Sequence, residues 1–284
     1  MTQSQNGQPL LRLQGVGKNF GPVHALTDIN LDIPAGKVTA LVGDNGAGKS
    51  TLIKTISGIW QPDHGDLFWQ GQAVHLHSPR AATELGISTV YQDLALCDNL
   101  DIVQNMFLGR EVLRHRQLDE INMELSAKGT LADLSVVTVR SIRQPVGSLS
   151  GGQRQAVAVA KAVMQNAKLL ILDEPTAALG VTQTKVVLDL IGQLASREIA
   201  VIVISHNLND VMAVADRVAV LHLGRLAAAG PISEFDRQVM VDLMTTGTSM
   251  REPGHSGGDG GASEQEPATA AAEEQTEGGR VSGN

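Results

Sequence analysis

The chain contains little cysteine, few aromatic residues and no long hydrophobic run. Its single cysteine, Cys97, excludes an internal disulfide and fits a reducing compartment. Apolar runs such as residues 169–172 and 199–204 have the length of strands, whereas a membrane-spanning helix needs roughly 20 apolar residues. Residues 1–9 are a polar extension without the apolar core of a signal peptide. We therefore expect a cytoplasmic protein that reaches a membrane only through another subunit.

A basic stripe is also missing. The 284 residues carry a formal net charge of −8, so nucleic acid is a poor candidate partner. Residues 251–284 contribute much of this charge, with seven acidic residues and two arginines. From residue 247 onward Gly, Ser, Ala, Glu and Pro dominate, and we expect 247–284 to be a disordered acidic tail. The length permits one large domain or two small ones, and the apolar residues, 42% of the chain, suffice for a hydrophobic core.

One stretch, residues 43–51, organises the rest of the chain. Its G-x-x-x-x-G-K-[ST] pattern is typical of the phosphate-binding loop of nucleoside triphosphatases. A strand-like segment precedes it and a helix-like segment follows, as the motif requires; a chance glycine-rich turn is the alternative. Lys49 is expected to reach the β- and γ-phosphates, and Ser50 to hold Mg²⁺. The expected nucleotide-binding residues here are Gly43, Asp44, Asn45, Gly46, Ala47, Gly48, Lys49, Ser50 and Thr51.

Two carboxylates follow the apolar run 169–172. Asp173, at the strand tip, suits a contact with Mg²⁺, and Glu174 suits a base that aligns water. Two surface acids at the end of a strand are the alternative. A second anion site is expected at Ser150-Gly151-Gly152-Gln153, because Ser150 is a good N-cap and the glycines leave N–H groups bare at a helix start. This site has no lysine of its own and is a weak signal alone.

Three further residues are ambiguous on local evidence. Phe20 lies in an expected turn, where its ring could be a platform for a nucleotide base or a satellite contact of the core. Gln92 follows an expected strand over 87–91, at the end where open α/β sheets bind ligands. His206 follows an expected strand over 200–204, where a capping or loop role is commoner than catalysis. The remaining histidines show no metal-ligand spacing with Cys97, so no metal beyond Mg²⁺ is expected.

The apolar pattern predicts an α/β fold with a mostly parallel sheet around the phosphate-binding loop. Alternating segments over 10–16 and 24–33 predict an N-terminal antiparallel β subdomain. Helical periodicity over 100–110 and 118–128 predicts an inserted helical subdomain at about 98–150. The other expected elements are hairpins over 66–75 and 217–229 and helices over 79–85, 154–165, 182–195, 207–215 and 234–244.

The sequence motifs described above, in the order in which they occur along the chain, resemble those of the ATP-binding subunits of ABC transporters over residues 10–245. Residues 149–153 read LSGGQ, and they lie between a Walker A motif at 43–51 and a Walker B motif at 169–173. This arrangement is highly specific for that family. The resemblance implies ATP and Mg²⁺ as ligands, Gln92 as a Q-loop residue near the metal, and His206 as a switch histidine at the γ-phosphate. It also implies that Phe20 stacks on adenine and that Glu174 is the catalytic carboxylate, acting with Lys49. The matching residues are Phe20, 43–51, Gln92, 149–153, 169–173, Glu174 and His206.

A narrower likeness involves the segments T-V-Y-Q-D-L-A-L, N-M-F-L-G-R-E and I-S-H-N-L. They look like those of monosaccharide importer ATPases of the ribose, xylose and fructose type. Such ATPases are often two fused copies, whereas this chain has one intact copy, which implies a dimer of identical chains around two ATP molecules. The implied partners are integral-membrane permease subunits and, indirectly, a sugar-binding protein. Gly180 stands where many relatives have aspartate, and Lys161 where arginine is common, so those contacts cannot be assumed.

Two other functions remain as alternatives: an ABC ATPase not linked to transport, and an ATP-gated regulatory module that barely hydrolyses. The first kind usually has paired ATPase domains or a long coiled-coil insertion, and this chain has neither. Intact Glu174 and His206 argue against the second. A transport ATPase on the cytoplasmic face of a membrane is therefore the expected function.

Overall fold

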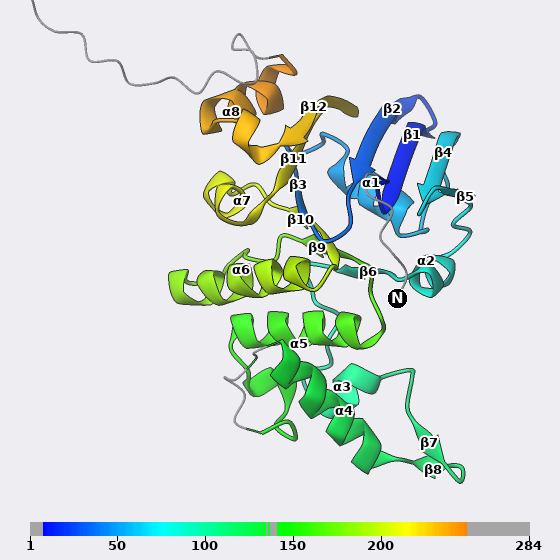
Figure 1. The fold of residues 1–284 in the computed structure, drawn as a ribbon, viewed down its shortest axis with the longest axis vertical. Coiled ribbons are helices and arrows are strands. Elements are labelled where there is room, and N and C mark those ends of the chain that lie inside the picture. Colours follow the sequence, from blue (N-terminus) through cyan, green and yellow to red (C-terminus); the bar gives the residue numbers. More distant parts are fainter. Residues whose placement is uncertain (1–7, 135, 137–140, 249–284) are drawn as a thin grey trace, which may run out of the picture.

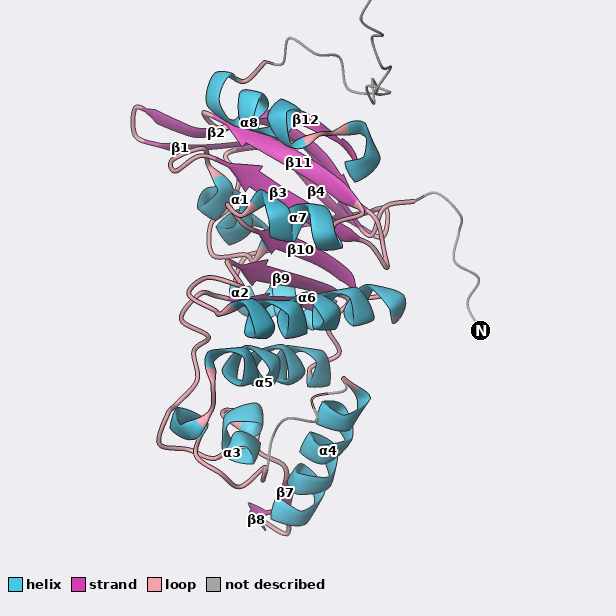
Figure 2. Ribbon diagram, turned by 90° about the vertical axis from the view of Figure 1, so that its left-hand side faces the viewer, coloured by secondary structure: helices cyan, strands magenta, loops and turns pink. Residues whose placement is uncertain are grey.

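The computed structural model describes residues 8–134, 136 and 141–248, and two sheets form the body of this part (Figures 1 and 2). The larger sheet has the strand order β12-β11-β3-β10-β9-β6. Its strands are parallel except β12, which pairs antiparallel with β11 at the edge. The mostly parallel sheet is therefore confirmed. Its strands are β3 (Val38–Gly43), β6 (Ile87–Val90), β9 (Leu169–Asp173), β10 (Ala200–Ile204), β11 (Arg217–His222) and β12 (Arg225–Pro231).

The smaller sheet is antiparallel, as expected, with the order β2-β1-β4-β5. One expectation is wrong here: Phe20 is not in the turn. The ladder between the first two strands continues to Phe20 and Val23, because β-bulges between Leu13 and Asn19 absorb the irregular pairing and leave only two residues to turn. The strands are β1 (Leu11–Phe20), β2 (Val23–Ile33), β4 (His64–Trp69) and β5 (Gln72–Val74).

The helices occupy the predicted places, with shifted ends. The closing helix begins only at Arg237, since the Asp236 side chain accepts a bond from Val239 N–H and caps it there. A short hairpin of β7 (Leu113–Arg114) and β8 (Gln117–Leu118) was not expected. All its strand residues are exposed, so the sequence has no alternation of buried and exposed positions there to indicate strands. The helices are α1 (Lys49–Ile56), α2 (Pro79–Leu85), α3 (Ile102–Phe107), α4 (Glu120–Asp133), α5 (Gly151–Met164), α6 (Val181–Ser196), α7 (Leu208–Val214) and α8 (Arg237–Thr246).

Two hydrophobic cores lie on opposite faces of the larger sheet. Alternate side chains of one strand point to opposite faces, so Leu170 and Leu172 join one core while Leu169 and Ile171 join the other. The first core includes residues of α3 to α8, and the second joins α1 to the antiparallel sheet. Fully buried strands explain why 169–172 and 200–204 are continuous apolar runs in the sequence.

The inserted helical region lies at the end of the molecule away from the antiparallel sheet (Figure 1). Helices α3, α4 and α5 pack against one another, and α5 also packs against α6, which connects the region to the main sheet (Figure 2). The limits of 98–150 for this subdomain remain a prediction. The expected acidic tail lies, from residue 249 onward, outside the described residues. Among the residues described, no helix has the length and apolar character to cross a bilayer.

Candidate functional site

The loop between β3 and α1 folds tightly around two glycines. Gly43 has φ 155°, and a Cβ there would collide with the carbonyl oxygen of Leu221. Gly48 has φ 104°, and its Cβ would lie 2.8 Å from the carbonyl oxygen of Ala25. Only glycine fits both positions. The loop therefore brings the start of α1, with its unpaired N–H groups, to the end of the sheet.

The side chain of Lys49 lies against this loop and donates hydrogen bonds to its backbone. Its Nζ donates to the carbonyl oxygens of Gly43 at 2.6 Å and Asp44 at 3.0 Å. Burial lowers the pKa of the Lys49 ammonium, and the nearby carboxylates of Glu174, Asp44 and Asp173 act in the opposite direction. An anion bound in the loop would add negative charge beside this half-buried cation and favour its charged form. The arrangement is that of a phosphate site.

A cleft of about 600 Å³ opens above the loop. It brings together residues from the ends of several strands that lie far apart in the sequence, including Gln92 after β6 and Asp173 and Glu174 at the end of β9. This edge is where ligands bind in open α/β sheets. The lining residues are Val23, His24, Ala25, Asn45, Gly46, Ala47, Gly48, Lys49, Ser50, Thr51, Gln92, Asp173, Glu174, Ile204, Leu223 and Gly224.

The two carboxylates of the cleft differ in their surroundings. Burial raises the pKa of Asp173, and Glu174 raises it further, while Lys49 and Lys54 pull it down. Glu174 is mostly buried and has φ 50°, and its N–H donates to the carbonyl oxygen of Ile204 at 3.0 Å. This bond fixes the backbone of Glu174 to the neighbouring strand. His206 Nδ1 lies 2.8 Å from Glu174 Oε2, so the structure brings these two predicted residues together.

The segment Ser150-Gly151-Gly152-Gln153 begins α5, as expected. Ser150 and Gln153 form a capping box, in which Ser150 N–H donates to Gln153 Oε1 at 2.9 Å. The glycines allow close packing on α6 and on the loop before it, since a Cβ on Gly152 would lie 3.2 Å from Gln183 Cβ and one on Gly151 would lie 2.7 Å from a methyl carbon of Leu179. Of the described residues that line the cleft, none belongs to this segment. Within one chain, the second anion site is therefore separate from the first.

Phe20 does not line the cleft either. Its ring packs edge-on against Trp60, with ring centroids 4.7 Å apart, and Lys18 Nζ lies 5.7 Å from the Phe20 centroid. Phe20 is 40% exposed, which is more than is usual for a residue of the hydrophobic core. Val23, His24 and Ala25 of β2 form the adjoining wall of the cleft instead. The stacking of Phe20 on a base remains a prediction.

The sequence analysis missed Leu223 and Gly224, the turn between β11 and β12. Gly224 N–H donates to Ala47 O at 3.0 Å, and Gly224 O accepts from Thr27 N–H at 2.8 Å, so the turn connects the phosphate loop to β2. Gly224 has φ 76° and no room for a Cβ beside Ala25. The expected hairpin marked the turn, but only the pairing of β11 with β3 places it beside the loop.

This fold and cleft define a P-loop nucleotide-binding protein, and comparisons narrow the class. The ABC transporter family matches residues 26–177. The chain is 42% identical over 253 residues to the fructose import ATP-binding protein FrcA of Rhizobium meliloti, covering 87% of this chain and 96% of the relative. It is 45% identical over 237 residues to the xylose/arabinose import ATP-binding protein XylG of Sulfolobus acidocaldarius, covering 84% and 94%.

A solved structure has the same fold. The structure of cbiO1 from Clostridium perfringens, part of the ABC transporter complex cbiONQ, aligns with a TM-score of 0.70 at 26% identity, covering 84% of this chain and 96% of that one. The chain belongs to the ATP-binding proteins of ABC transporters. It is an ABC-type ATPase.

Proposed function

We propose that this chain is the ATP-hydrolysing subunit of an importer for a simple sugar, and that it works on the cytoplasmic face of a membrane with separate permease subunits. The import of a sugar is supported by the names of FrcA and XylG, which share 42% and 45% of their aligned residues with it. The sugar itself would be selected by the permease and by a sugar-binding protein. This chain would supply the energy.

The cleft suits MgATP in size and chemistry. Ser50, Gln92 and Asp173 line it together and offer oxygen atoms, which Mg²⁺ prefers as ligands. Burial already makes ionisation of Asp173 costly, and a divalent cation beside it would offset this cost. These residues therefore fit Mg²⁺ and would hold it. The ion, when bound, neutralises charge on the phosphates.

The single observation that carries the proposal is that Lys49, Asp173 and Glu174 meet in one cleft at the end of the parallel sheet. Phosphoryl transfer depends mainly on positioning and on charge stabilisation. Lys49 would bind the β- and γ-phosphates, and Glu174 would orient or deprotonate the attacking water. His206, beside Glu174, would hold the γ-phosphate.

A homodimer would complete the site. The helix start at Ser150-Gly151-Gly152 has the backbone N–H groups to bind phosphate, yet it does not line the cleft of its own chain. A two-fold dimer would let this helix start close the ATP held by the other chain. ATP would then favour the closed dimer, because it contacts both chains only in that state.

Reconstitution with its permease and sugar-binding protein in vesicles tests the function. Labelled fructose, xylose and ribose are offered in turn, with MgATP inside with the ATPase. We expect one or more to be taken up, and uptake to stop with Lys49→Ala. If no monosaccharide is taken up and none stimulates ATP hydrolysis, while another class of solute does both, the sugar assignment is wrong.

A further inference from the structure

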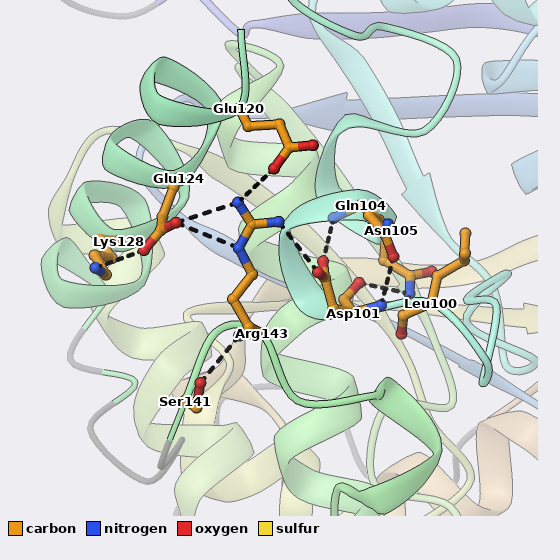
Figure 3. A network of polar contacts seen from close by, with 9 residues as sticks. All are labelled: Leu100, Asp101, Gln104, Asn105, Glu120, Glu124, Lys128, Ser141 and Arg143. Carbon is orange, nitrogen blue, oxygen red and sulfur yellow. Dashed lines mark hydrogen bonds and ion pairs between the residues drawn. The ribbon is translucent and has the colours of Figure 1, made fainter. Parts of the chain in front are cut away.

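Asn105, in α3, is a fully buried polar residue that does not line the nucleotide cleft. Its side-chain amide nitrogen donates toward three backbone carbonyl oxygens, those of Cys97 at 2.9 Å, Leu100 at 3.2 Å and Asp101 at 3.0 Å. Its Oδ1 accepts from Cys97 N–H at 2.7 Å. Figure 3 shows the amide beside Leu100 and Asp101. Asn105 therefore fixes the backbone of 97–101, the segment that connects Gln92 to α3.

The same segment holds the chain just before Ser150. Val146 N–H donates to Leu100 O at 3.0 Å, and Gly147 N–H donates to Asp98 O at 2.9 Å. Both acceptors lie within the stretch that Asn105 fixes. The position of the LSGGQ helix start is thus connected, through these backbone bonds, to a side chain on α3.

Two arginines strengthen this connection. Arg143 forms ion pairs with the carboxylates of Asp101 at 3.3 Å and of Glu120 and Glu124 at 3.2 Å (Figure 3). Arg154, in the first turn of α5, contacts the Asp98 carboxylate at 3.4 Å and the carbonyl oxygen of Leu149 at 3.3 Å. The two arginine side chains are partly exposed, whereas the Asn105 side chain is fully buried. Its loss would leave the Cys97 N–H without its acceptor and would remove one of the two hydrogen bonds that each of the three carbonyl oxygens accepts.

We propose that Asn105 is a positioning residue that sets the place of the Ser150-Gly151-Gly152 helix start, and so controls how one chain closes the ATP site of the other. The inference rests on the proposed ATP-bound dimer. Loss of the Asn105 side chain should leave the phosphate loop of the same chain intact. The damage should appear only at the site that the altered chain completes for its partner.

Mixed dimers separate these two effects. Two differently tagged full chains, both carrying Glu174→Gln, are expressed together with the permease subunits and purified through both tags. Lys49→Ala in one chain leaves a single competent phosphate loop, that of the other chain. Asn105→Ala is then placed either on the chain with Lys49→Ala or on the chain without it. The measured quantity is labelled ATP retained per dimer after rapid desalting.

We expect about tenfold less retained ATP when Asn105→Ala and Lys49→Ala are on the same chain, because that chain supplies the only LSGGQ segment in use. Retention should be unchanged in the other arrangement. Ser150→Arg should show the same dependence, and Asn122→Ala, an exposed asparagine of α4, should show none. If Asn105→Ala chains do not fold, as judged by thermal unfolding, Arg154→Gln replaces them.

Equal retention in both arrangements for Asn105→Ala, with Ser150→Arg still dependent on arrangement, would overturn the positioning role and leave the dimer standing. If Ser150→Arg is also independent of arrangement, the shared ATP site is wrong and this inference falls with it.

Discussion

His206 Nδ1 lies 2.8 Å from Glu174 Oε2, although 31 residues separate the two along the sequence. The contact follows from the sheet: β9 and β10 are parallel neighbours, and Ile204 is paired with Asp173, so the residues after both strands emerge side by side. The histidine side chain is 74% exposed and that of the glutamate 18%. The glutamate is thus held in the cleft, while the histidine remains accessible to a ligand or a second chain.

Glu174→Gln should bind MgATP and hydrolyse it very slowly. Glutamine keeps the size of the side chain but cannot accept a proton from water, and it removes a negative charge near the triphosphate. The unhydrolysed ATP should hold two chains together, so size-exclusion chromatography should give a dimer with ATP and mainly a monomer without it. Adding Ser150→Arg should abolish this dimer while leaving the phosphate loop intact. Wild-type hydrolysis by Glu174→Gln, with the permease present, would remove Glu174 from the catalytic role.

A hydrogen bond between Thr176 and Asp210 should support catalysis from outside the cleft. Thr176 Oγ1 donates to Asp210 Oδ2 at 2.6 Å, and Asp210 is buried. The bond connects the loop after Glu174 to the helix after His206. Asp210→Leu should lower kcat about tenfold with little change in KM, because the loops lose their fixed spacing. Asp210→Asn keeps an acceptor oxygen and should retain most of the rate; equal loss in both variants would contradict this reading.

Asp173→Asn should make the protein more stable and less active. Burial raises the pKa of Asp173 in the folded protein above its value in the unfolded chain. The protein therefore loses stability as the pH rises from the unfolded-state pKa to the folded-state pKa, and it does not regain this stability at higher pH. A neutral asparagine removes this cost. The thermal midpoint of the nucleotide-free protein should therefore rise at neutral pH, and the gain should shrink as pH falls toward the ordinary pKa of aspartate.

The same variant should lose Mg²⁺-dependent ATP hydrolysis. Asp189→Asn, an exposed aspartate on α6, is the matched control and should change neither quantity. A lowered midpoint for Asp173→Asn at neutral pH would mean that the attraction to Lys49 and Lys54 outweighs the cost of burial.

Phe20→Ala should weaken ATP binding by about 1–3 kcal/mol, the usual contribution of a base stacked on an aromatic ring. Phe20→Tyr should keep most of the affinity, and fluorescence titration with a labelled ATP analogue measures both. The contact with Trp60 provides a comparison. Trp60→Ala should reduce ATP binding less than Phe20→Ala, since it removes only the ring that packs against Phe20 and leaves the Phe20 ring in place. Unchanged ATP affinity in Phe20→Ala, with a lower thermal midpoint, would make Phe20 a packing residue.

Local sequence was enough to predict the phosphate loop and the ends of the main strands. Glycines at 43 and 48 suit the positive φ angles of the loop, and the apolar runs 169–172 and 200–204 match strands buried on both faces. The capping of α5 by Ser150 is equally local. These features depend on backbone geometry and burial within a few residues, so they are visible in the order of the amino acids.

Other features were decided only by tertiary structure. The order of β3, β10 and β9 brings Glu174 and His206 together, and the pairing of β11 with β3 places Gly224 against the phosphate loop. An asparagine such as Asn105 looks like any polar helix residue until the packing of α3 buries it. Such contacts join residues distant in sequence, and their energy comes from burial and hydrogen bonds that exist only once the chain has closed on itself.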